Sequence, residues 1–203
     1  MPTQRFLSLP AEKQARITQA LIDEFAEQGS DSASVAGIIK RAGIPRGSFY
    51  QYFADLSDGL AYVHQIIMQA KQVYLADAFR IMGKAPFFEF LNVAFAQSLD
   101  FIAENPQYSK IGDHMWHSKD KDAKRLVEQA RRQGEQFYAK LIQQDIDKGL
   151  LNSQTDPMLV ARIIMSMFTD LLTHILWEEH VSRQEAQRTI SGILEIIRRG
   201  VVV

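Results

Sequence analysis

Residues 34–53, SVAGIIKRAGIPRGSFYQYF, have the pattern of two short helices broken at Gly43. Four apolar residues at helical spacing give the first segment one apolar face: Val35, Ile38, Ile39 and Ala42. Ser34 is a suitable N-cap, and Gly43 can adopt the left-handed conformation that ends a helix. Pro45 then suits the opening of a second helix. This order predicts a helix-turn-helix.

The second helix presents polar groups opposite a buried face. Phe49 and Phe53 lie four residues apart and share the apolar side. The remaining side chains must point elsewhere, and they carry a guanidinium, hydroxyls, an amide and phenols: Arg46, Ser48, Tyr50, Gln51 and Tyr52. Groups of these kinds contact phosphates and base edges of DNA. The segment therefore favours nucleic-acid binding.

Charge is distributed unevenly along a nearly neutral chain. The net charge of the 203 residues is −1, which gives no overall basic character. Between Ser32 and Ala54, however, the sequence has no acidic residue and three basic ones, Lys40, Arg41 and Arg46. A small basic face is therefore expected around the helix-turn-helix.

Composition narrows the class of protein. Cysteine is absent, so disulfides and thiolate chemistry are excluded, and 46% hydrophobic residues allow a sizeable core. We find no signal peptide and no apolar run of the roughly 20 residues that span a membrane, so we expect a cytoplasmic protein. His114 and His117 have no third ligand nearby, so we expect no metal site. The sequence shows no catalytic constellation and no cofactor motif, so we expect no enzyme.

The rest of the chain predicts further helices and no strands. We expect helices at 11–28, 57–81, 87–103, 107–117, 120–148, 157–179 and 182–197. The helix from Pro157 is apolar almost all round, so it must be buried inside its domain or at a subunit interface. With the last helix, it predicts a dimer interface. The fold class is therefore all-α.

Polar residues on that apolar helix leave two interpretations open. Asp170 and His174 lie four apart, and their burial costs several kcal/mol unless they are paired. They form either a paired polar seam at a dimer interface or a polar anchor in a ligand cavity. Nearby apolar side chains fill the core or line that cavity: Met115, Tyr138, Met165 and Phe168. These four, with Asp170 and His174, are our candidate ligand-binding residues.

The block AGIPRGSFYQYF at 42–53, preceded by EFAEQG at 24–29, resembles the tetracycline-repressor (TetR/AcrR) family of bacterial transcriptional regulators. The resemblance implies a homodimer with an N-terminal three-helix DNA-binding domain and a larger C-terminal helical domain for ligand binding and dimerisation. We place these domains at 1–56 and 57–203. The resemblance also implies a repressor that leaves a palindromic operator when a small molecule binds, and that dimerises through the last two helices.

The resemblance also assigns DNA contacts by position. Arg46, Gly47, Ser48 and Gln51 match positions near bases or phosphates. Tyr50 and Tyr52 match family positions whose hydroxyls usually contact phosphate. Ser34 and Val35 match the start of the supporting helix, where backbone N–H groups can bind a phosphate.

This chain departs from the family pattern in two places. Leu56 stands where the family commonly has Lys, between the acids Asp55 and Asp58. Gly37 lies inside the supporting helix, which costs about 1 kcal/mol relative to Ala. An alternative function is therefore a helical small-molecule-binding or adaptor protein with weak or no DNA binding.

Overall fold

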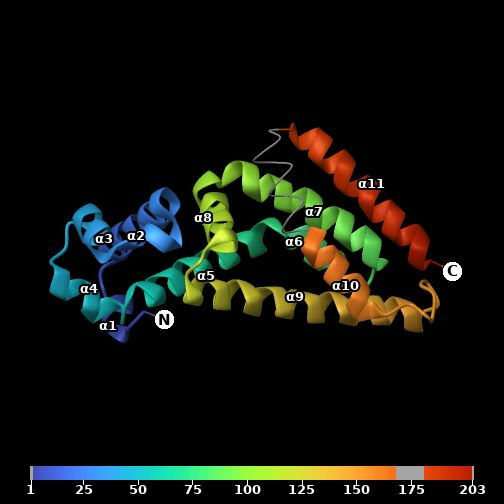
Figure 1. Cartoon of the computed structure of the whole chain (residues 1–203), viewed down its shortest axis with the longest axis horizontal. Helices are drawn as coiled ribbons and strands as arrows, with labels where there is room; N and C mark the ends of the chain where they lie inside the picture. The colour runs from blue at the N-terminus through green and yellow to red at the C-terminus, as the bar shows by residue number, and fades with distance from the viewer. Residues whose placement is uncertain (1, 168–180, 203) are drawn as a thin grey trace. The chain divides into compact units, whose positions relative to one another are not determined.

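The computed structural model describes residues 2–167 and 181–202 (Figure 1), and within these ranges every regular element is a helix. A single isolated antiparallel bridge pairs Leu151 with Val202 in the same ranges. The prediction of an all-α fold is confirmed. The helices are α1 Gln4–Leu7, α2 Ala11–Ser32, α3 Val35–Ala42, α4 Arg46–Tyr52, α5 Leu56–Tyr74, α6 Ala76–Ile81, α7 Phe87–Glu104, α8 Pro106–His117, α9 Lys121–Asp147, α10 Pro157–Ser166 and α11 Arg183–Val201.

The chain packs as two compact units. The first contains residues 1–70 and 105–128, and the second contains 71–104 and 129–203. These units differ from the predicted domains 1–56 and 57–203, because α8 packs against α2 and so joins the first unit. The functional boundary at residue 56 stays a prediction.

The first unit is built around α2, which packs against both α3 and α8. Four aromatic side chains in it are fully buried: Phe6, Phe25, Phe49 and Phe53. α1, which the sequence did not predict, brings Phe6 to within 5.1 Å of Phe53 and 5.3 Å of Tyr62, measured between ring centroids. This core holds α4 against the start of α5.

α2 extends beyond its predicted end but bends there. Gly29 has a φ of 69°, a conformation that favours glycine, and the helical turn that follows reaches Ser32. A Cβ at Gly29 would lie only 3.0 Å from Nδ1 of His114 on α8. The absence of a side chain at Gly29 therefore lets His114 of α8 approach α2 closely, in agreement with the place of α8 in the first unit.

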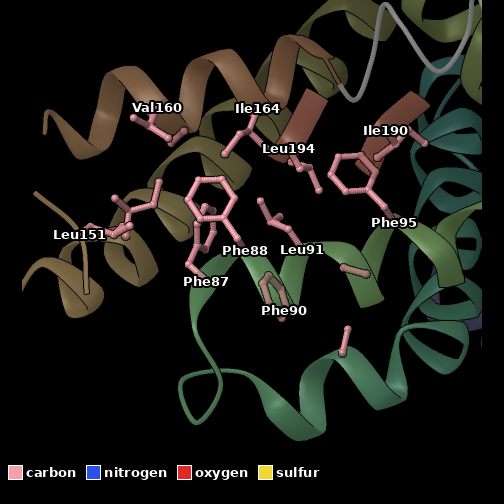
Figure 2. Packing of buried hydrophobic residues seen from close by; sticks show 14 of the residues in the cluster. Phe87, Phe88, Phe90, Leu91, Phe95, Leu151, Val160, Ile164, Ile190 and Leu194 are labelled. Atoms are coloured by element: carbon pink, nitrogen blue, oxygen red, sulfur yellow. The ribbon is translucent and has the colours of Figure 1, made fainter. Parts of the chain in front are cut away.

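The core of the second unit is centred on α7. Figure 2 shows side chains of α7 directed toward those of α10 and α11. The labelled members include Phe87, Leu91 and Phe95 of α7, Val160 and Ile164 of α10, and Ile190 and Leu194 of α11. The predicted helix at 87–103 is confirmed as α7, and its central position in this core is a finding of the structure.

The prediction of one continuous helix over 57–81 is wrong, because α5 ends at Tyr74 and α6 begins at Ala76. The N–H of Ala78 donates to Oε1 of Gln97 on α7 at 3.1 Å, and so turns away from the carbonyl that a continuous helix would offer. Nε2 of Gln97 also donates to Oδ2 of Asp77 at 3.1 Å. A partner some 20 residues away leaves no mark on local periodicity.

Both C-terminal helices begin where the sequence predicted helices, and each has a side-chain cap. Asp156 accepts from the N–H groups of Met158 and Leu159 at the start of α10. Ser182 and Glu185 form a capping box at the start of α11. α10 is described to Ser166, and residues 168–179 of the predicted helix 157–179 lie outside the described part of the chain.

Candidate nucleic-acid interface

The helix-turn-helix has the predicted local geometry. The hydroxyl of Ser34 accepts from the N–H of Gly37 at 3.0 Å, which caps α3. Gly43 ends α3 with φ 60° and ψ 41°, in the left-handed region. Pro45 is the N-cap of α4, and Phe49 and Phe53 are fully buried as expected.

Most of the predicted DNA-contacting residues of α4 are accessible. Arg46, Gly47 and Gln51 are exposed, and Ser48 is half-buried. Tyr50 leaves 48% of its surface exposed while its ring packs edge-on against Phe49 at 5.4 Å. One short helix therefore presents a guanidinium, a phenol and an amide to the solvent.

Tyr52 occupies a different position from Tyr50. Only 3% of its surface is exposed, and its ring lies 5.9 Å from that of Phe6. Nζ of Lys13 lies 5.9 Å from the centroid of the Tyr52 ring, within range of a cation–π interaction. Tyr52 is thus a core residue of the first unit, and its phosphate contact stays a prediction.

A buried carboxylate that the sequence analysis missed organises α3. Glu24 of α2 is only 4% exposed. Its Oε1 accepts from the N–H of Ser34 at 3.0 Å and from the hydroxyl of Ser34 at 3.2 Å. Its Oε2 accepts from Nε of Arg41 at 3.0 Å. Glu24 therefore joins the two ends of α3.

Gly37 makes this contact possible. A Cβ on Gly37 would lie 2.1 Å from Oε1 and 2.2 Å from Oε2 of Glu24, well inside van der Waals contact. In an ordinary capping box, an acidic side chain at the third helical position accepts from the N-cap N–H. Here Gly37 occupies that position, and Glu24 supplies the carboxylate from α2. We call this arrangement of Ser34, Gly37 and Glu24 the divided capping box.

Arg41 forms ion pairs with two acids of α2, Glu24 and Glu27. Its guanidinium donates to both carboxylate oxygens of Glu27, at 3.1 and 2.6 Å, and to Glu24. Hydrogen bonds to Glu27 and Glu24 raise the pKa of Arg41 above its usual value. All three basic residues of this helix pair are exposed, and Arg41 is the one that acids of α2 hold in ion pairs.

The acids that flank Leu56 cap α5. Oδ1 of Asp55 accepts from the N–H of Asp58 at 2.8 Å, and Oδ2 of Asp58 accepts from the N–H of Ala54 at 3.1 Å. The first bond satisfies an N–H that the first turn of α5 leaves unpaired, and the second ties the residue before Asp55 back to the same turn. The structure therefore accounts for both acids by helix capping.

Asp31, just after the bend in α2, binds the connection between α8 and α9. Its carboxylate accepts from the hydroxyl of Ser118 and from the N–H groups of Lys119 and Asp120, both at 3.1 Å. The hydrogen bond from Ser118, followed by that from Lys119, lowers the pKa of Asp31. Asp31 thus connects the end of α2 to the segment between α8 and α9 within the first unit.

The predicted ligand-binding residues fall in both units, and some lie outside the described part of the chain. Met115 is buried in the first unit, whereas Tyr138 and Met165 belong to the second. Met165 packs over Gly134, where an added Cβ would lie 2.9 Å from its Sδ. Phe168, Asp170 and His174 lie outside the described residues.

Tyr138 stands in an aromatic cluster of the second unit. Its ring lies 5.8 Å from that of Phe87, 6.4 Å from that of Phe90 and 5.6 Å from that of Phe137. Burial raises the pKa of the Tyr138 hydroxyl above its usual value.

His114 and His117 each contact another group of the first unit through Nδ1. Nδ1 of His114 lies 3.4 Å from the carbonyl oxygen of Phe25, and Nδ1 of His117 lies 3.1 Å from Oδ1 of Asp113. Over residues 2–167 and 181–202, no cluster of three or more potential ligands could hold a metal ion. Among the helices in those ranges, none is long and apolar enough to cross a membrane.

Residues 17–55 match the family described as bacterial regulatory proteins, tetR family, and residues 86–173 match the tetracyclin repressor-like C-terminal domain. The chain belongs to the tetracycline-repressor family. It is therefore a DNA-binding transcriptional regulator with a ligand-binding domain, and the alternative of an adaptor without DNA binding has no support.

Relatives and solved structures of the TetR family agree with this assignment. An uncharacterized HTH-type transcriptional regulator of Bacillus subtilis, YvdT, is 45% identical over 43 residues, which are 21% of this chain and 22% of that protein. A TetR-family regulator from Chloroflexus aurantiacus is 28% identical, with a TM-score of 0.72 over 100% of this chain and 99% of the other. SmeT of Stenotrophomonas maltophilia, a multidrug efflux pump repressor, has the same fold at 17% identity, with a TM-score of 0.73 over 98% and 93% of the two chains.

Proposed function

We propose that this protein represses transcription by binding a palindromic operator as a homodimer and that a small-molecule effector releases it. The exposed face of α4, with Arg46, Tyr50 and Gln51 above a buried Phe49, is the observation that supports operator binding. Two such helices, one from each protomer, would enter successive major grooves about 34–36 Å apart.

Exposed apolar residues on the last two helices support the dimer. α10 buries Val160 and Ile164 against α7, yet Leu159 and Ile163 on the same helix are 55% and 46% exposed. On α11, Ile196 is 72% exposed. Helices that are apolar on two faces need a second covering surface, and we assign that role to the same helices of a second protomer.

The fold supports an effector in the C-terminal domain. SmeT, which shares this fold, has also been solved in complex with the small molecule triclosan. We propose Met115, Tyr138, Met165, Phe168, Asp170 and His174 as effector contacts. Release would require the effector to favour a dimer state with wrongly spaced recognition helices, and a coupling of about 1–3 kcal/mol is typical of such effects.

The experiment begins by selecting an operator from a random duplex library with the purified protein. Operator affinity is then measured for Arg46→Ala combined with Tyr50→Phe. We expect a loss of about tenfold or more, because a good bidentate base contact contributes about 1–3 kcal/mol. Arg80→Ala, which removes an exposed arginine of α6, is the matched control and should bind normally. Unchanged operator affinity in the double variant would overturn the assignment of α4.

A further inference from the structure

The segment before α2 is bonded to the end of the recognition helix. The N–H of Thr3 donates to the carbonyl oxygen of Tyr52 at 2.9 Å. The hydroxyl of Thr3 donates to the carbonyl oxygen of Gln51 at 2.7 Å. α1, which Thr3 caps, lies beside α4 in the first unit (Figure 1).

These two bonds meet a specific need of α4. The last four carbonyls of any helix lack partners within the helix. α4 has only seven residues, so its final turn has little helical stabilisation of its own. Thr3 supplies two donors to that turn from a position 48 residues earlier than Gln51 in the chain.

α1 is itself firmly placed. Phe6 is fully buried and contacts the rings of Tyr52, Phe53 and Tyr62. The N–H of Phe6 also donates to the Thr3 hydroxyl at 3.4 Å, so the same hydroxyl caps α1 while it binds α4. Because Phe6 anchors α1 in the aromatic core, Thr3 can hold the end of α4 in a fixed position relative to that core.

We propose that Thr3 is a positioning residue for DNA recognition, which holds the last turn of α4 so that the Gln51 side chain meets the operator in a fixed register. The proposal rests on the proposed function of α4. A role confined to stability would lower binding to every DNA duplex alike, whereas positioning affects the selected operator more than random sequence.

Thr3→Val tests this, because valine keeps the shape and the N–H but loses the hydroxyl. We expect operator affinity to fall about three- to tenfold, the range for one neutral hydrogen bond, while affinity for random-sequence duplex stays within about twofold. Thr3→Ser restores the hydroxyl and should bind the operator normally. Ser8→Ala is the matched control, since the Ser8 hydroxyl donates to the carbonyls of Gln4 and Arg5 within α1.

Amide hydrogen exchange provides a second measurement on the same variants. The N–H of Phe53, bonded to the carbonyl of Phe49 at 2.9 Å, reports on the last turn of α4. Thr3→Val should accelerate its exchange several-fold, and Thr3→Ser should leave it unchanged.

The proposal is overturned if Thr3→Val binds the operator as tightly as the unsubstituted protein, if Thr3→Ser loses as much as Thr3→Val, or if random duplex is affected equally. If the Arg46→Ala, Tyr50→Phe variant loses operator affinity and Thr3→Val does not, the positioning role of Thr3 is rejected and the role of α4 is kept. Retained binding in that double variant would reject the role of α4 itself.

Discussion

Substituting Gly37 by alanine should destabilise the protein, although alanine is the better helix former. On helix propensity alone, Gly37→Ala in the middle of α3 gains about 1 kcal/mol. The new Cβ would meet both carboxylate oxygens of Glu24 at 2.1–2.2 Å. The carboxylate must then move away from the N–H and hydroxyl of Ser34, and each lost hydrogen bond costs about 1 kcal/mol.

Overpacking at such a site adds about 1–3 kcal/mol. Two lost hydrogen bonds and overpacking, less the gain in helix propensity, give an expected net loss of about 2–4 kcal/mol in the free energy of unfolding, measured by urea denaturation. Gly112→Ala is the matched control, because Gly112 is also helical but nothing lies within 4 Å of an added Cβ. It should stabilise the protein by up to about 1 kcal/mol.

A double-mutant cycle isolates the contact. With Glu24→Ala in place, Gly37→Ala should no longer destabilise, so the two substitutions should be non-additive by about 2 kcal/mol or more. If Gly37→Ala stabilises as much as Gly112→Ala, or if the effects of the cycle simply add, the divided capping box does not hold α3 as described.

Three further outcomes follow from the structure. The logarithm of operator affinity should fall linearly with the logarithm of salt concentration, since phosphate contacts release counterions; a flat response in a titration would contradict DNA binding through phosphates. Hydrogen bonds lower the pKa of Asp31, so its carboxylate stabilises the fold fully at pH values above the ordinary pKa of 3.8, and this stabilisation is lost as the pH falls through the lowered pKa. Asp31→Asn should therefore flatten the acid limb of a stability–pH profile. Ile196→Glu should shift the protein toward monomer in light scattering, and an unchanged dimer would exclude α11 from the interface.

The sequence predicted those features that depend on neighbouring residues. Ser34 and Gly43 could be assigned as caps because capping depends on residues within one turn. The buried pair Phe49 and Phe53 followed from helical spacing in the same way.

Features set by distant partners could not be predicted. Glu24 looks like an ordinary surface acid of an amphipathic helix, and only the fold brings it against Gly37. Tyr50 and Tyr52 are chemically identical in the sequence, but the unpredicted α1 covers one of them and leaves the other exposed. In each case, contacts more than ten residues away along the chain decide the outcome.

The divided capping box also defines which segment can be exchanged between relatives to transfer operator preference. A donor segment that begins at the start of α3 and brings its own acid at position 37 would place a second carboxylate at the site that the Glu24 carboxylate already occupies. Such a chimera would be expected to fold poorly even if its recognition helix were ideal. The smallest transplantable cassette therefore begins at Glu24, so that the helix that supports recognition travels with the residue that caps it.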